Sequence, residues 1–321
     1  MFHFCTYFDK NYLTKGLTLF KSLKKHSDPF RLYVLCMDEE THQFIQALEE
    51  QYNELIAIAL KDLEAWDDEL LAAKKNRSQI EYYFTLSPIL PLYVFNLSND
   101  IDIVTYLDAD LYFYSNPRQI YDELGKNSIL IIEHRFTKVL KKFEKNGRFN
   151  VQYQSFRNDK QGVACLERWR MQCLEWCRDR SENGKYADQG YLNEWPDRYD
   201  RLVVSQLKGA GAAPWNIAQY EIEINNDGVT VDDKPLVFYH FHSVRKLFNL
   251  VYTTEFGVYK LNKKQKNLIL LYKKYLLELE KVYFEFKVEN IAPASQEIRY
   301  NKYQLLLLIK YILKRNLFLK P

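Results

Sequence analysis

Short apolar runs alternate with amphipathic stretches at the start of the chain. Residues 2–7, 31–37 and 55–60 are continuous apolar runs, which are typical of buried strands. Between them, residues 12–25 and 39–52 carry apolar side chains at helical spacing. A strand–helix–strand–helix–strand order predicts a parallel sheet with helices on both faces.

The same pattern continues to about residue 255. It predicts further strands at 102–107, 128–133 and 235–241, a helix at 161–180, and a helix at 80–95 that Pro88 and Pro91 must break or start. Two more helices are expected at 263–283 and 301–319, joined by a loop at 291–295. We therefore expect an α/β domain at 1–255, with a mostly parallel, Rossmann-like sheet flanked by helices, and a helical, basic extension at 256–321.

Composition fits a folded core and excludes some partners. Hydrophobic residues make up 47% and charged residues 27% of the 321 residues, and the net charge of +3 weighs against a nucleic-acid partner. Residues 261–321, however, hold 13 Lys and Arg against 5 Asp and Glu, with many Leu and Tyr. Such a tail either lies on an anionic membrane surface or packs on the core with its lysines facing water.

The cysteines and the start of the chain point to a cytoplasmic protein, either free or peripheral on the inner membrane face. The five Cys form no CxxC pair and are not interleaved with the six His, so we expect reduced, buried thiols. The opening MFHFCTYFDKNY lacks the basic start and long apolar stretch of a signal peptide. The chain also has no apolar run of about 18 residues that would span a membrane.

The segment DIVTYLDADLYFYSNP, residues 102–117, is the first candidate for chemistry. An apolar strand delivers Asp108 and Asp110 to its carboxyl end, where open α/β sheets bind their ligands. Residues two apart in an extended chain point the same way, so both carboxylates can face one hard divalent cation. The alternative is a strand-end turn with two solvated aspartates.

A second apolar run, VFYHFHS at residues 237–243, ends in His240 and His242. Imidazole is a good ligand for manganese-type ions in mixed nitrogen and oxygen sites, so either His is a candidate ligand, and a structural role is the alternative. Lys246 and the adjacent Arg245 follow, and their charge could neutralise a diphosphate leaving group or simply be solvated.

Two polar segments complete the set of candidates. In KYADQGYLNEW, residues 185–195, Asp188 is a candidate helix N-cap or ligand and Gln189 offers an amide to a sugar. In GAGAAPWN, residues 209–216, glycines permit close backbone approach and Trp215 could stack on a sugar face or be buried. The chain has no Walker motif, no GxGxxG and no Ser or Cys paired with a His, which argues against kinase, dehydrogenase and covalent hydrolase chemistry.

Together these motifs resemble the GT-A-fold glycosyltransferases, nearest to the retaining family 8 type, over roughly residues 1–250. The matching segments are FCTYFDKNYLTKGLTLFKSL, YLDADLYFYSNP, ADQGYLN and HFHSVRKLF. The last departs from the family pattern, because Ser243 replaces Gly and Leu247-Phe248 replaces Pro-Trp. The segments FRNDKQGVACLERWRMQCLEWC and GAGAAPWN also resemble uncharacterised bacterial glycosyltransferase-like proteins.

The resemblance implies a donor, a metal and residue roles. The donor would be a nucleotide-diphosphate sugar, with a UDP-sugar favoured, held with Mn²⁺ or Mg²⁺. The implied metal ligands are Asp108, Asp110 and His240, with His242 as the alternative to His240. Catalytic roles are implied for Gln189, Asp188 and Lys246, and donor contacts for Thr6, Tyr7, Asp9, Arg77, Asp108, Asn158 and Trp215. The acceptor would be a surface glycan or lipid-linked saccharide, and a noncatalytic sugar-nucleotide or carbohydrate-binding protein is the alternative function.

Overall fold

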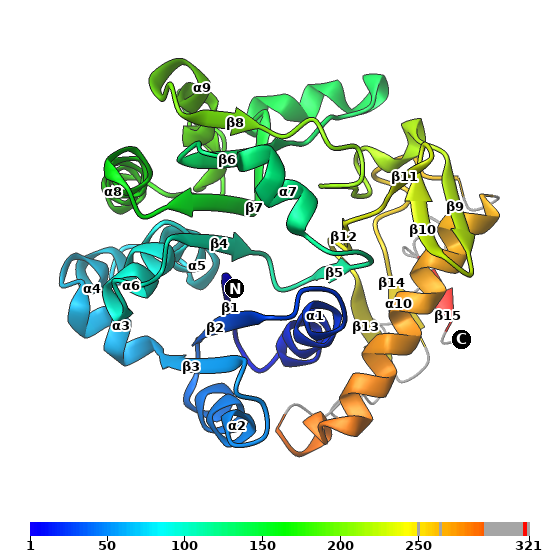
Figure 1. Cartoon of the computed structure of the whole chain (residues 1–321), viewed down its shortest axis with the longest axis horizontal. Helices are drawn as coiled ribbons and strands as arrows, with labels where there is room; N and C mark the ends of the chain where they lie inside the picture. Colours follow the sequence, from blue (N-terminus) through cyan, green and yellow to red (C-terminus); the bar gives the residue numbers. More distant parts are fainter. Residues whose placement is uncertain (249–250, 263–264, 292–316, 320–321) are drawn as a thin grey trace, which may run out of the picture.

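The computed structural model describes residues 1–248, 251–262, 265–291 and 317–319. A seven-stranded sheet in the order β3-β2-β1-β4-β7-β6-β8 forms its centre (Figure 1). All its neighbouring strands pair in parallel except at β7, which runs antiparallel to both β4 and β6. The predicted α/β class with a mostly parallel sheet is therefore confirmed.

The strands of the central sheet are β1 (Phe2–Phe8), β2 (Phe30–Cys36), β3 (Leu55–Ala59), β4 (Ile103–Leu107), β6 (Ile129–Glu133), β7 (Phe149–Arg157) and β8 (Leu202–Val204). The helices are α1 (Leu13–His26), α2 (Glu39–Glu49), α3 (Leu60–Trp66), α4 (Glu69–Lys74), α5 (Gln79–Leu86), α6 (Ile89–Leu97), α7 (Arg118–Leu124), α8 (Lys160–Glu175), α9 (Trp195–Arg198) and α10 (Lys266–Glu285). The described residues also form the 3₁₀ segments η1 (Lys138–Asn146), η2 (Gln189–Glu194), η3 (Ile217–Gln219) and η4 (Val288–Asn290).

Three smaller sheets lie beside the central one. Their strands are β5 (Leu111–Phe113) with β12 (Phe238–His240), then β9 (Ile222–Asn225), β10 (Gly228–Val231) and β11 (Lys234–Pro235), and finally β13 (Arg245–Phe248), β14 (Val251–Thr253) and β15 (Leu317–Leu319). The pairing of β5 with β12 brings two segments far apart in the sequence together, because Leu111 lies opposite His240.

Several predicted boundaries are wrong for identifiable reasons. The helix expected at 80–95 is broken at Pro88 into α5 and α6, as the sequence predicts, because Pro88 has no N–H to continue α5. The helix expected at 161–180 ends at Glu175, where Trp176 turns to extended backbone. The strand expected at 235–241 is split, because Val237 donates its N–H to the Gly209 carbonyl between β11 and β12.

The predicted tail helices have different outcomes. The first, expected at 263–283, is confirmed in α10. The second, expected at 301–319, falls at 301–316 outside the described residues, and Leu317–Leu319 are a strand, not a helix. Within the described residues, no helix is both long and apolar enough to cross a membrane.

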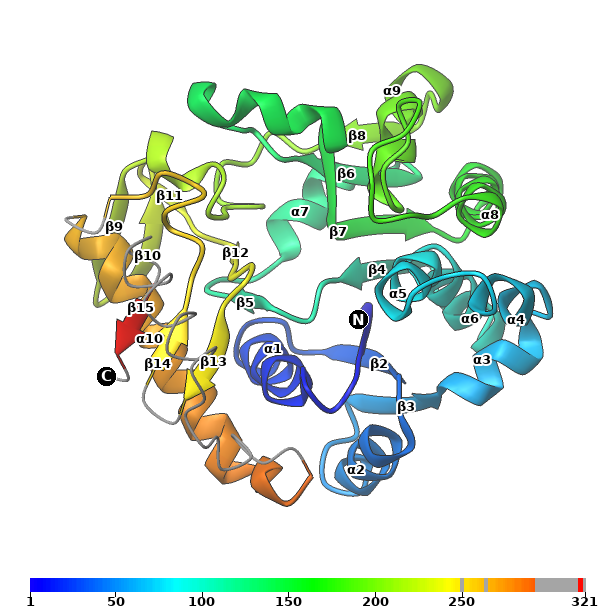
Figure 2. The same ribbon diagram turned by 180° about the vertical axis from the view of Figure 1, so that it is seen from behind.

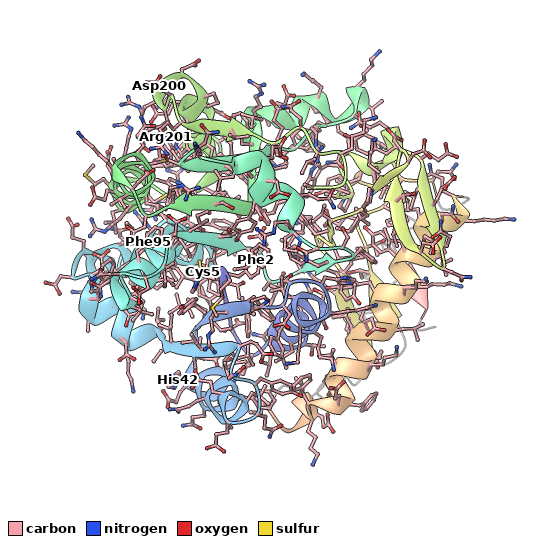
Figure 3. The ribbon with its side chains drawn as sticks, viewed as in Figure 1. Phe2, Cys5, His42, Phe95, Asp200 and Arg201 are labelled. Atoms are coloured by element: carbon pink, nitrogen blue, oxygen red, sulfur yellow. The ribbon has the colours of Figure 1, made fainter. Side chains whose placement is uncertain are left out.

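The two faces of the central sheet bury separate apolar cores. Helices α1, α2 and α7 cover one face, and α5, α6 and α8 cover the other. All five Cys are buried and unpaired, as predicted, and Figure 3 places Cys5 in the interior and Asp200 at the periphery. Helix α10 runs along the outside of the molecule next to α1, and its end shares the first core through Val282 and Phe286 (Figures 1 and 2).

Candidate metal centre

Asp108 and Asp110 are placed by the end of β4 and by two backbone contacts. Asp108 donates its N–H to the Gln152 carbonyl on β7, 2.9 Å away, and the Asp110 carbonyl accepts from the N–H of Phe241, 3.0 Å away. The second bond fixes the DxD turn to the end of β12, which carries His240. Two motifs 130 residues apart therefore meet at the carboxyl end of β4.

The two carboxylates and His240 form one cluster. His240 Nε2 lies 2.9 Å from Asp110 Oδ1 and 3.8 Å from Asp108 Oδ2. Potential ligand atoms of these three residues all lie within 4.8 Å of one another. Two carboxylate oxygens and one imidazole nitrogen fit a manganese- or magnesium-type ion, which would keep further positions for substrate oxygens.

The electrostatics of the cluster are uneven. Burial raises the pKa of Asp108 to about 6, although the neighbouring His240 opposes this. For Asp110, burial is outweighed by His240 and Lys15, so its pKa lies well below its ordinary value. The pKa of His240 is raised, because the attraction of Asp110 outweighs burial. The structure thus gathers one firmly charged carboxylate, one adaptable carboxylate and an imidazole, a set that suits a cation.

His242 lies beside the cluster but is not one of its three members. Its ring packs 5.7 Å from the ring of Trp215 and 6.1 Å from that of Tyr259, and burial lowers its pKa to about 4. Of the two candidate histidines, His240 is therefore the one whose Nε2 meets both carboxylates.

A cleft of about 850 Å³ opens over this cluster. Tyr7 and Asp9 at the end of β1 line one part of it, together with Tyr83, whose hydroxyl lies 3.5 Å from Asp9 Oδ2. Other parts are lined by aromatic side chains, among them Phe136, Phe143 and Tyr259. A cleft lined by both carboxylates and aromatic rings can hold a polar, ring-containing ligand beside a metal ion.

Asp188 and Gln189 also line the cleft, at the start of η2. Asp188 makes no side-chain cap, so the N-cap alternative does not apply; its Oδ2 accepts from the Ser87 hydroxyl at 2.7 Å. Burial raises the pKa of Asp188 to about 7, against the effect of that hydrogen bond. Gln189 donates from Nε2 to the Asn146 carbonyl at 2.8 Å, which holds the amide at the cleft wall.

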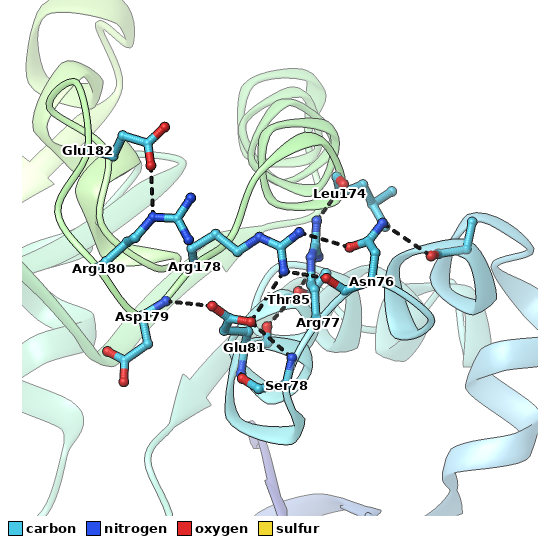
Figure 4. Close-up of polar contacts among 11 residues, drawn as sticks. Asn76, Arg77, Ser78, Glu81, Thr85, Leu174, Arg178, Asp179, Arg180 and Glu182 are labelled. Atoms are coloured by element: carbon cyan, nitrogen blue, oxygen red, sulfur yellow. Dashed lines mark hydrogen bonds and ion pairs between the residues drawn. The ribbon is translucent and has the colours of Figure 1, made fainter.

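The structure does not bring four expected site residues into the cleft. Arg77 instead turns toward Thr85 and the Leu174 carbonyl on α8 (Figure 4). Asn158 donates from Nδ2 to the Ile101 carbonyl, near the amino end of β4, whereas Asp108 follows the carboxyl end of that strand. Lys246 pairs with Glu280 of α10 at 2.7 Å, and Thr6 is fully buried within β1.

Trp215 is buried, with only 3% of its surface exposed, although its edge contributes to the lining of the cleft. Its ring lies edge-on to His134 and to His240, 5.2 Å from each. This geometry makes Trp215 a support between two histidines and leaves little of its face for a sugar to stack on.

Sequence reasoning missed the contribution of β7 and of α1. Asn150 and Gln152 stand beside the cluster because β7 runs antiparallel and begins there. The alternation of these polar residues with Val151 and Tyr153 predicts a strand, but it does not predict that the polar side chains are buried as well. Lys15, in the first turns of α1, lies 3.6 Å from Asp110 Oδ2, and nothing in the sequence spacing links it to that residue.

Solved glycosyltransferases have the same architecture. The galactosyltransferase LgtC, solved in complex with donor and acceptor sugar analogs, matches with a TM-score of 0.54 and 15% identity over 87% of this chain and 95% of its own. The apo structure of WbbM, a bifunctional glycosyltransferase, matches with a TM-score of 0.53 and 15% identity over 90% of this chain and 51% of its own. The chain therefore has the GT-A glycosyltransferase fold, of the kind found in LgtC.

Two proteins of Bacillus subtilis are more similar to this chain in sequence than these solved structures are. The uncharacterized protein YfnD of Bacillus subtilis (strain 168) is 31% identical over 285 residues, which cover 87% of this chain and 89% of YfnD. The uncharacterized protein YfnF of the same organism is 33% identical over 252 residues, which cover 75% of this chain and 81% of YfnF. No family model matches the chain. The chain belongs to the family of YfnD and YfnF.

Proposed function

We propose that this protein is a metal-dependent glycosyltransferase that moves a sugar from a nucleotide-diphosphate sugar, with UDP-sugars favoured, to a hydroxyl acceptor. The observation that carries the proposal is the convergence of Asp108, Asp110 and His240 in a cleft of ligand size at the carboxyl end of β4. The GT-A fold supports it, since LgtC was solved with donor and acceptor sugar analogs.

In this proposal Asp108, Asp110 and His240 hold the cation. A divalent cation at this position would neutralise charge that develops on the diphosphate leaving group. Tyr7 and Asp9 would meet the base, and Asp188 and Gln189 would orient the donor sugar. We propose retention of anomeric configuration, with the acceptor hydroxyl attacking from the leaving-group face and a phosphate oxygen taking its proton. On that route no side-chain nucleophile is required.

The direct test is a thermal-shift screen of UDP-, GDP- and dTDP-sugars, each with and without Mn²⁺, followed by donor hydrolysis assays without acceptor. A metal-dependent shift with one nucleotide and measurable turnover is the expected result. Binding without turnover would favour the noncatalytic sugar-nucleotide-binding alternative. No nucleotide-dependent shift at all would rule out both.

Asp110→Asn tests the metal cluster. Donor turnover at saturating Mn²⁺ should fall at least about a hundredfold, because several kcal/mol of charge stabilisation depend on the bound cation. Asp100→Asn is the matched control, since Asp100 is exposed before the amino end of the same strand. Turnover of Asp110→Asn close to that of the control would contradict the metal role.

We also propose the partners that this chemistry needs. The acceptor would be a glycan or lipid-linked saccharide, and the aromatic side chains Phe136, Phe143 and Tyr259 in the cleft support a sugar-binding role. Contact with an anionic membrane surface is proposed through α10, which exposes Leu270 and Leu277 beside Lys273 and Lys274.

A further inference from the structure

The ring nitrogen of His240 that points away from the carboxylates faces Gln152. Its Nδ1 lies 2.9 Å from Gln152 Oε1, and both residues are almost completely buried. On the other side of the ring, Nε2 faces the two carboxylates. The His240 ring therefore lies between the Gln152 amide oxygen and the proposed metal position.

Gln152 is itself fixed by the strand on which it lies. Its backbone carbonyl accepts from the N–H of Asp108 at 2.9 Å, and its backbone N–H donates to Asn150 Oδ1 at 2.8 Å. Asn150 in turn donates from Nδ2 to His134 Nε2 at 2.8 Å, and His134 Nδ1 lies 3.2 Å from the Arg148 carbonyl. One residue of β7 thus contacts both the strand that ends in the DxD motif and the histidine from β12.

The GAGAAPWN segment, residues 209–216, packs its backbone against His240 and Gln152. The N–H of His240 donates to the Ala212 carbonyl at 2.9 Å. Gly211 has a φ of +80°, and a Cβ there would lie 3.1 Å from Gln152 Nε2 and 2.6 Å from Ile132 Cγ2. The glycine in this motif therefore permits a close backbone approach to Gln152.

We propose that Gln152 is a positioning residue that fixes the tautomer and the ring orientation of His240, so that Nε2 carries no proton and is presented to the metal. A neutral imidazole has one N–H, and the nitrogen without it is the ligand. An amide oxygen at Nδ1 selects the tautomer with the proton on Nδ1, as carboxylate and carbonyl oxygens do when they accept from metal-bound histidines. The inference rests on the proposed metal-dependent function.

The test compares two glutamines on one strand. Gln152→Met keeps the length of the side chain but removes the acceptor. Gln154→Met is the control, since Gln154 is equally buried and lies two residues farther along the same strand. The measured quantity is the Mn²⁺ dissociation constant, from the electron paramagnetic resonance signal of free Mn²⁺. Gln152→Met should weaken Mn²⁺ binding about 10- to 100-fold, and Gln154→Met should leave it unchanged.

Two further measurements separate positioning from general loss of structure. With ¹⁵N-labelled histidine and a Mg²⁺ concentration that saturates the wild type, the long-range ¹H–¹⁵N spectrum should show His240 as the Nδ1–H tautomer in wild type. In Gln152→Met, a fraction of His240 should lack bound metal and lose that signature. Gln152→Glu retains an acceptor and should bind Mn²⁺ at least as tightly as wild type does, which keeps the proposal testable if the Met variant does not fold.

The outcomes are distinct. Equal Mn²⁺ affinity in wild type and Gln152→Met, or equal weakening in Gln154→Met, would overturn the positioning role and leave the proposed function standing. An absence of Mn²⁺ binding by the wild type, with and without UDP, would overturn both.

Discussion

Arg245 and Lys246 are neighbours on β13, and the alternation of a strand sends their side chains to opposite sides. Arg245 lines the cleft, whereas Lys246 Nζ pairs with Glu280 Oε1 of α10. Lys15 is buried, which lowers its pKa, and the charge of Arg245 lowers it further against the pull of Asp110. Because Arg245 lines the same cleft as Asp108, Asp110 and His240, we propose that it takes the diphosphate role that the sequence resemblance implies for Lys246.

Substituting Arg245 and Lys246 one at a time should separate the diphosphate-binding role from the structural role. Arg245→Gln should weaken binding of UDP with Mn²⁺ about tenfold or more, because a charge-assisted contact to phosphate is lost. Lys246→Gln should leave that affinity unchanged and lower the free energy of unfolding by about 1–3 kcal/mol, since the buried Glu280 loses a cationic partner. Calorimetric titration and chemical denaturation measure the two quantities. The reverse pattern would return the diphosphate role to Lys246.

At the scale of elements, the start of α5 is tied to the loop after α8 by Glu81. Ser78 and Glu81 form a capping box, and Glu81 also accepts from the backbone N–H of Asp179 at 3.2 Å and from Arg178 at 3.3 Å (Figure 4). Burial by itself would raise the pKa of Glu81, but the N–H groups of Ser78 and Asp179 outweigh it and lower the pKa to about 2. This contact positions the segment that leads to Asp188.

The lowered pKa has a consequence for stability. A carboxylate whose pKa is lower in the folded than in the unfolded state stabilises the fold above its unfolded pKa of about 4.3, and that contribution is lost as the pH falls toward about 2. Glu81→Gln should therefore cost about 1–2 kcal/mol at pH 7, with the difference from wild type shrinking below pH 4. Urea denaturation between pH 3 and pH 8 measures it; a difference that does not vary with pH would contradict the role of the charge.

Strand β7 carries site residues that the sequence pattern did not predict. The strands β1, β2, β3, β4 and β6 were predicted because their residues are apolar on both faces, as buried parallel strands are. In contrast, β7 alternates apolar and polar residues from Phe149 to Gln154, and its polar residues Asn150, Gln152 and Gln154 are buried too, whereas alternation alone is typical of a strand with one solvent-facing side. The Asn that the family resemblance implies at the donor is Asn158, whereas the fold brings Asn150 into the cleft.

At the scale of the whole molecule, α10 is both a part of the core and an outer surface. Its inner side packs with Tyr272 and Tyr275 in the core formed with β12, while Leu270 and Leu277 are 40% and 42% exposed. These two side chains lie one heptad apart on the same side of the helix, with the exposed Lys273 and Lys274 to either side. Apolar side chains flanked by lysines suit an anionic lipid surface better than a second helix, which would need further apolar positions.

Vesicle sedimentation tests that surface. The wild type should bind phosphatidylglycerol-containing vesicles more than pure phosphatidylcholine vesicles, and Leu270→Ser with Leu277→Ser should weaken the binding severalfold because less apolar surface enters the interface. Met171→Ser on α8 is a control, as its side chain is 59% exposed elsewhere. Binding that is equal for the two vesicle types, or unchanged in the double variant, would contradict contact of α10 with an anionic membrane.

Local physics determined much of this protein from the sequence alone. Apolar strands, amphipathic helices and the aspartates at a strand end depend on residues close together in the chain, so the α/β class and the DxD position followed from periodicity. Only the tertiary structure decided that His240 rather than His242 meets the aspartates, that Gln152 and Lys15 stand behind them, and that Lys246 is drawn away to α10. Those contacts join residues from about 34 to more than 130 positions apart, and such pairings are fixed by how strands align and which faces pack.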